Sequence, residues 1–129
     1  MSNFPKQLTS PGTLKTGQSG DCWRCCVAYL IRNRDLHSIP DFVNIYREDF
    51  ILETQIWLQN KGFYLARNPN LIPNVESSSY LIVVGQSPRD GQNCHAVVKQ
   101  GTSLIYDPHP DETGIVSPIY DTYLITRLL

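Results

Sequence analysis

The segment GDCWRCCVAYLIRNR, residues 20–34, predicts the first helix of this chain and places a cysteine at its start. Its apolar side chains recur at helical spacing. Asp21 stands directly before the run, where a side-chain oxygen can cap free backbone amides. We therefore expect a helix that begins at Cys22 and turns Cys25 and Cys26 toward the core.

Two further helices are expected in the first half of the chain. The second begins at Pro40-Asp41. Its apolar residues are Phe42, Val43, Ile45 and Tyr46. The third covers Ile51 to Gln59 and stops at Gly62. Residues 1–20 are rich in Pro, Gly, Ser and Thr, and they predict an extended N-terminal arm.

The second half of the chain has the pattern of β-strands, with β-branched and aromatic runs separated by turns. The expected strands cover residues 63–66, 80–84, 95–99 and 104–107, with a last strand within 119–129. Because helices come first and antiparallel strands follow, we predict an α+β fold with the N-terminal helices packed on an antiparallel β-sheet. The length of 129 residues fits one domain, residues 1–129.

Composition and charge disfavour several classes of function. The formal net charge of -1 gives no field that attracts nucleic acid or an anionic membrane. No apolar run approaches the roughly 20 residues that cross a bilayer. The first residues lack the pattern of a signal peptide, so we expect a cytoplasmic protein whose four cysteines are free thiols.

Three residues have the chemistry of a nucleophilic site. A cysteine attacks as its thiolate, which the free N–H groups and dipole of a helix N-terminus favour, and Cys22 is expected there. His95 opens a predicted strand and is a candidate base for the thiol. Asp107 ends the next strand. If the two strands pair as a hairpin, its carboxylate comes close to His95 and can orient the imidazole.

The segments that contain these residues resemble a known family. They are GDCWRCCVA at 20–28, CHAVV at 94–98 and IYDP at 105–108. In this order they resemble the papain-like cysteine peptidases, most closely the branch of bacteriocin-processing peptidases. In that branch an Asp-Cys pair opens the first helix, a His starts a strand, and an Asp-Pro ends the next strand. Residues 20–42 also resemble small uncharacterised proteins common in phage genomes.

The resemblance implies a papain-like fold and a cysteine hydrolase, either a peptidase or an amidase. Cys22, His95 and Asp107 would form the catalytic triad and cleave an amide or isopeptide bond through a thioester, with no cofactor or metal. The substrate would be a peptide or a small amide. The family also uses a glutamine before the cysteine as an oxyanion donor. Gln18 is the candidate here, beside the backbone N–H of Cys22.

Two more residues are candidates for substrate contact. Trp23 lies early in the first helix, where it can form a wall of the cleft. His109 follows Asp107 and Pro108 in a loop, where it is a candidate rim residue and a rival base to His95.

Other interpretations of these residues remain open. His95 can be a structural histidine, and Asp107 can cap a turn before Pro108. The set Cys22, Cys25, Cys94 and His95 can be written as a zinc site, although adjacent strand residues point to opposite faces. The Cys22-x-x-Cys25 spacing also fits a redox pair, but no strand is expected before this helix.

The alternatives to a hydrolase keep the same fold. A transamidase would use the same triad with an amine in place of water. A catalytically inactive papain-like binding module, such as a phage accessory protein or an inhibitor, would keep only the fold.

Overall fold

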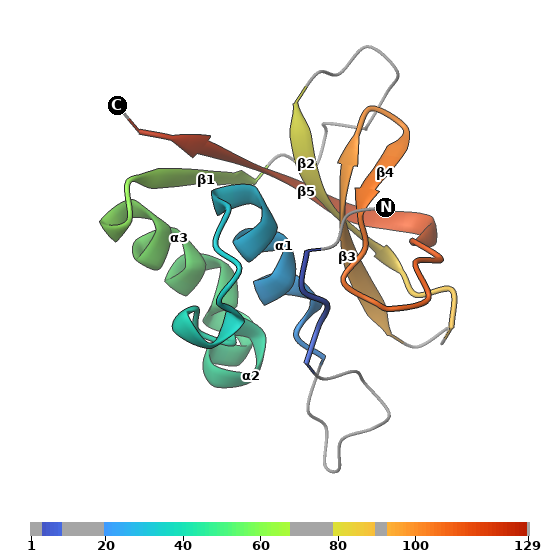
Figure 1. Ribbon diagram of the computed structural model, residues 1–129, viewed down its shortest axis with the longest axis horizontal. Coiled ribbons are helices and arrows are strands. Elements are labelled where there is room, and N and C mark those ends of the chain that lie inside the picture. Colours follow the sequence, from blue (N-terminus) through green and yellow to red (C-terminus); the bar gives the residue numbers. More distant parts are fainter. Residues whose placement is uncertain (1–3, 9–19, 68–78, 90–92, 129) are drawn as a thin grey trace.

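The computed structural model describes residues 4–8, 20–67, 79–89 and 93–128, and Figure 1 shows how its helices and sheet are arranged. The helical elements are α1 (Cys22–Ile31), η1 (Leu36–Ser38), α2 (Phe42–Tyr46), η2 (Arg47–Asp49) and α3 (Phe50–Asn60). The strands are β1 (Phe63–Arg67), β2 (Tyr80–Gln86), β3 (Cys94–Gln100), β4 (Ser103–Tyr106) and β5 (Val116–Arg127). Helices precede strands, so the predicted α+β class is confirmed.

The strands form one antiparallel sheet in the order β1-β5-β2-β3-β4. The last strand, β5, therefore lies between β1 and β2 and joins the two parts of the sheet. It begins at Val116, earlier than expected from the sequence, because Pro118 interrupts the strand pattern and the pairing with β2 shifts register there. The α-helices lie on one side of this sheet (Figure 1).

Apolar side chains are buried on both faces of β2. Ile82 packs in the cluster that α1 shares with the sheet, whereas Leu81 and Val83 belong to a second cluster with Val97. Alternate residues of a strand point to opposite faces, so a continuous apolar run is what a strand covered on both sides requires. The strand predicted over 80–84 from its β-branched and aromatic residues is confirmed, and β2 extends it to Gln86.

The first helix packs its cysteines as the sequence predicts. Cys25 and Cys26 are fully buried, with no exposed surface. The helix ends at Ile31, and the next residue, Arg32, adopts a left-handed φ of 62° and donates its backbone N–H to the carbonyls of the last turn. In α2, by contrast, Phe42 is buried while Ile45 is 59% exposed, so the apolar side chains of that helix do not all face the core.

The described part of the N-terminal arm, residues 4–8, packs against the rest of the protein. Phe4 is buried, and its ring contacts the rings of Tyr29 in α1 and Tyr106 in β4. This segment passes between α1 and the β3–β4 pair (Figure 1). Among the described residues, no helix has both the length and the apolar character needed to cross a membrane.

Candidate active site

Cys22 is the first residue of α1 and is partly exposed. The first N–H groups of a helix have no partner within the helix, so they can stabilise negative charge on this sulfur. Asp21 precedes Cys22, and its backbone carbonyl accepts the N–H of Cys25.

The carboxylate of Asp21 does not cap the helix, in contrast to the sequence-based expectation. It accepts a hydrogen bond from Arg24 Nη2 at 2.7 Å and one from the backbone N–H of Leu8 at 3.1 Å. Arg24 also donates to the carbonyl of Ile39, and its side chain is only 11% exposed. Arg24 and Asp21 therefore form an almost fully buried ion pair beside Cys22.

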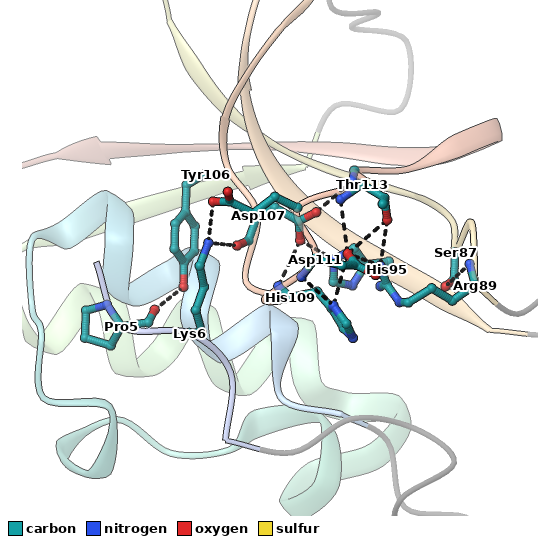
Figure 2. Close-up of polar contacts among 12 residues, drawn as sticks. Pro5, Lys6, Ser87, Arg89, His95, Tyr106, Asp107, His109, Asp111 and Thr113 are labelled. Carbon is teal, nitrogen blue, oxygen red and sulfur yellow. Dashed lines mark hydrogen bonds and ion pairs between the residues drawn. The ribbon is translucent and has the colours of Figure 1, made fainter. Parts of the chain in front are cut away.

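His95 and Asp107 are in direct contact. His95 Nε2 lies 2.6 Å from Asp107 Oδ1, and both side chains are buried (Figure 2). His95 is near the start of β3, and Asp107 directly follows β4. Antiparallel pairing of these strands brings the two residues to the same end of the sheet, as the sequence predicts.

The turn after β4 is organised around the Asp107 carboxylate. Besides His95, Oδ1 accepts the backbone N–H of His109 at 2.9 Å, and Oδ2 accepts the N–H of Gly114 at 2.7 Å. Burial by itself raises the pKa of Asp107, but the hydrogen bonds and the charge of His95 outweigh it and hold that pKa below its usual 3.8. The residue is therefore a carboxylate with a fixed orientation at neutral pH.

The imidazole of His95 also interacts with Cys22. Burial lowers the pKa of His95, but hydrogen bonding to Asp107 and to Cys22, together with their charges, raises it to about 9. Because Nε2 faces Asp107, Nδ1 is the nitrogen left to face the sulfur. The structure thus brings the three predicted residues together, with the histidine between the thiol and the carboxylate.

The three other predicted site residues differ in where they lie. Trp23 is only 3% exposed. Its Nε1 donates to Thr54 Oγ1 at 3.0 Å and its ring contacts Phe50 and Tyr123, so it packs between α1, α3 and β5 and does not form a wall of the cleft. The position of Trp23 in the helix suits a core side chain as well as one in a cleft, so the sequence pattern does not distinguish the two. Gln18 lies outside the described residues.

His109 does lie beside the triad. Its ring centroid is 6.4 Å from that of His95 in an edge-on arrangement, and its side chain is 22% exposed. Nδ1 is held by the backbone N–H of Asp111 at 3.1 Å. A partly exposed side chain beside His95 fits the predicted rim position. The ring that contacts the Asp107 carboxylate is that of His95, so His95 and not His109 has the partner expected of a base.

The cysteines of the alternative sites have different surroundings. Cys25 is buried against Tyr106, and burial raises the pKa of its thiol far above the usual range. Cys94 is exposed, and desolvation followed by the charge on Cys22 raises its pKa. In the part of the chain that the structure describes, no three His, Cys, Asp or Glu side chains are grouped to hold a metal ion.

A hollow of about 420 Å³ lies at a different place, between α3 and β1. It is lined by Glu48, Asp49, Ile51, Leu52, Gln55, Leu65 and Arg67. Neither Cys22 nor His95 nor Asp107 borders it.

Two contacts of the site could not be found by reading the sequence locally. Lys6 Nζ donates to the backbone carbonyl of Asp107 at 2.7 Å, across 101 positions of the chain. Gly114 supplies an N–H to the Asp107 carboxylate. The Asp21–Arg24 pair, in contrast, has a helical i, i+3 spacing that could have signalled it.

Comparison with protein-family models, with curated proteins and with solved structures finds no match to this chain.

Proposed function

We propose that this protein is a papain-like cysteine hydrolase that cleaves an amide or isopeptide bond. One observation carries the proposal: the buried imidazole of His95 contacts the carboxylate of Asp107 at 2.6 Å while it interacts with the thiol of Cys22. A helix that begins at the cysteine and packs on an antiparallel sheet bearing the histidine and aspartate supports the papain-like assignment.

The reaction follows from the roles that these groups can take. The Cys22 sulfur, as thiolate, attacks the substrate carbonyl carbon, and its C–S bond forms while the carbonyl π electrons move to oxygen. The backbone N–H of Cys22 and the amide of Gln18 are the proposed donors to that oxyanion. The imidazolium of His95 then gives its proton to the leaving amine as the C–N bond breaks, and a thioester remains.

Water completes the cycle. His95, now neutral, takes a proton from water as the oxygen attacks the thioester, and the C–S bond breaks to release the acid and restore the thiolate–imidazolium pair. Asp107 keeps the ring oriented and stabilises its charged form in both steps. An amine that enters in place of water would make the same residues a transamidase.

The substrate class follows from the same chemistry and is a peptide, an isopeptide or a small amide. His109, at the rim of the site, is the residue that we assign to substrate contact. Trp23 is not included, because its buried indole has a structural partner in Thr54.

Selective alkylation tests the proposal without a known substrate. Cys94 is exposed and serves as an internal reference thiol. With limiting iodoacetamide at pH 6, the modification of each cysteine is followed by peptide mass spectrometry. We expect Cys22 to react at least about tenfold faster than Cys94, and the His95→Ala variant to lose this preference. Equal rates at the two thiols, or a preference that survives His95→Ala, would overturn the proposed function.

Turnover tests the remaining steps. Amide and peptide substrates in a pooled library should be cleaved by the wild-type protein and not by Cys22→Ala, which keeps the fold because Cys22 is partly exposed at the helix start. A reactive Cys22 that cleaves nothing in the library but joins amines to acyl donors identifies the transamidase. A reactive protein that does neither fits the binding module.

A further inference from the structure

The N-terminal segment Phe4–Leu8 lies between the two halves of the candidate site. Its Phe4 ring packs edge-on against Tyr29 of α1, with ring centroids 5.2 Å apart, and against Tyr106 of β4, with centroids 5.5 Å apart. The helix that begins at Cys22 and the strand that ends beside Asp107 therefore meet the same buried side chain.

Polar contacts continue this bridge along the segment. The Tyr106 hydroxyl donates to the carbonyl of Pro5, and the backbone N–H of Gln7 donates to the carbonyl of Pro108 at 2.9 Å. These contacts flank Asp107 on both sides in the sequence. The next N–H, of Leu8, reaches the Asp21 carboxylate at 3.1 Å, one residue before Cys22.

Lys6 is the residue of this segment that contacts Asp107 itself. Its ammonium donates to the backbone carbonyl of Asp107 at 2.7 Å and to Glu112 Oε2 at 2.8 Å, and it lies 5.3 Å from the centroid of the Tyr106 ring (Figure 2). One side chain thus joins the first and sixth positions of the 107–114 turn. Charge-assisted hydrogen bonds of this kind are stronger than those between neutral groups.

The same turn is held from its other side. Arg89, just after β2, donates to both carboxylate oxygens of Asp111 and to the hydroxyl of Thr113 (Figure 2). Arg89 contacts the side chains at the tip of the turn, whereas Lys6 reaches the carbonyl of Asp107 itself. The N-terminal contact is therefore the one placed to affect how the Asp107 side chain faces His95.

We propose that the segment Phe4–Leu8 is a positioning element of the active site, and that Lys6 is the residue through which it holds the Asp107 backbone, and so His95, relative to Cys22. This inference rests on the proposed function. Lys6 contacts neither the thiol nor the imidazole, and it acts through Asp107.

The test compares the alkylation of Cys22 by iodoacetamide at pH 6 and pH 9 in the full chain. Lys6→Met removes the ammonium and keeps most of the side-chain length, while Lys6→Arg restores a cationic donor. Lys61→Met is the matched control, because Lys61 follows α3 and its ammonium lies over the Trp57 ring. Circular dichroism and thermal unfolding confirm that each variant is folded.

A small displacement of a catalytic group lowers reactivity strongly, so we expect Lys6→Met to slow alkylation at pH 6 about fivefold. The ratio of the rate at pH 6 to the rate at pH 9 should also fall, because a poorly held imidazolium stabilises the thiolate less. Lys6→Arg should recover most of the wild-type rate and ratio, and Lys61→Met should match the wild type. If Lys6→Met does not fold, Glu112→Gln, which removes the ion-pair partner of Lys6, should lower the same ratio.

The outcomes separate a failure of the proposed function from a failure of the role of Lys6 alone. A wild-type Cys22 that is no more reactive than Cys94 overturns the proposed function, and this inference with it. A reactive wild-type Cys22 whose rate and pH ratio are unchanged in folded Lys6→Met, or in Glu112→Gln where Lys6→Met does not fold, overturns only the positioning role of Lys6. A loss in Lys6→Met that Lys6→Arg does not restore also overturns it.

Discussion

His95 Nε2 lies 2.6 Å from Asp107 Oδ1, although twelve positions separate the two residues in the chain. The antiparallel pairing of β3 with β4 places Val98 opposite Tyr106. His95 precedes Val98 and Asp107 follows Tyr106, so both residues lie toward the same end of the sheet. The contact leaves Nδ1 of the imidazole for Cys22. The orientation of His95 therefore depends on where β4 ends, because Asp107 is the residue that follows it.

Replacing Asp107 with Asn should weaken the reactive state of Cys22. The amide keeps the size of the side chain but removes the charge that stabilises the His95 imidazolium, so the pKa of His95 should fall below its value of about 9. We expect alkylation of Cys22 at pH 6 to slow by about tenfold or more. NMR titration of the His95 ring measures the pKa directly.

Asp111→Asn is the control for that prediction, because Asp111 belongs to the same turn but pairs with Arg89 and His109. It should leave the pKa of His95 and the alkylation rate close to those of the wild type. If the pKa of His95 is the same in Asp107→Asn and Asp111→Asn, the assigned role of Asp107 is wrong.

The stability of the fold should depend on pH through the same pair. The pKa of His95 rises from 6.5 to about 9 on folding, so its contribution is complete below pH 6.5 and is lost as the pH rises through 9. The pKa of Asp107 is lowered, so its contribution is present above its usual 3.8 and is lost as the pH falls. The contribution of the pair to stability is therefore greatest between pH 3.8 and pH 6.5, the ordinary pKa values of the two groups.

Urea unfolding at several pH values measures this dependence. From pH 6 to pH 9.5 we expect the buried imidazole to account for a loss of about 3 kcal/mol in the free energy of unfolding. The loss should be smaller in Asp107→Asn, whose imidazole lacks the carboxylate partner. A wild-type stability that rises over this pH range would contradict the raised pKa of His95.

Thr54→Val should separate the structural role of Trp23 from a role in substrate binding. The Thr54 hydroxyl accepts the indole N–H at 3.0 Å and donates to the carbonyl of Phe50 at 2.6 Å. Valine is similar in shape but leaves a buried donor without an acceptor, so we expect a loss of about 1–3 kcal/mol. Alkylation of Cys22 should keep its wild-type rate. Thr126→Val, on the exposed end of β5, should change stability little.

Gly85→Ala should destabilise the end of β2 that pairs with His95. A Cβ at this position would lie 2.9 Å from Ile115 Cδ1 and 3.4 Å from the carbonyl oxygen of Pro118. Overpacking of this kind costs about 1–3 kcal/mol. Ile115→Val removes the clashing methyl, so the double variant should lose less stability than the sum of the two single losses. Additive losses in chemical denaturation would show that the Ile115 methyl is not the cause.

Local pattern was enough to predict the α-helices and strands of this fold, although not where β5 begins. Periodicity and turn residues indicated the helix at Cys22, the strand at 80–84, the strand that contains His95 and the strand that Asp107 follows, because each depends on neighbours within a few positions. Sequence reasoning erred where one residue type suits two environments. Trp23 packs in the core and does not line the cleft, and the Asp21 carboxylate pairs with Arg24 and does not cap the helix.

The α+β order of helices and strands can be read from the sequence alone, as can a cysteine, a histidine and an aspartate at the ends of elements that can meet. The packing of the chain is what brings these three residues together, places β5 between β1 and β2, and carries Lys6 to the carbonyl of Asp107. The two kinds of feature differ in the distance along the chain over which they depend. Propensity, capping and periodicity act over a few residues, whereas a contact across 101 positions depends on how all the intervening elements pack.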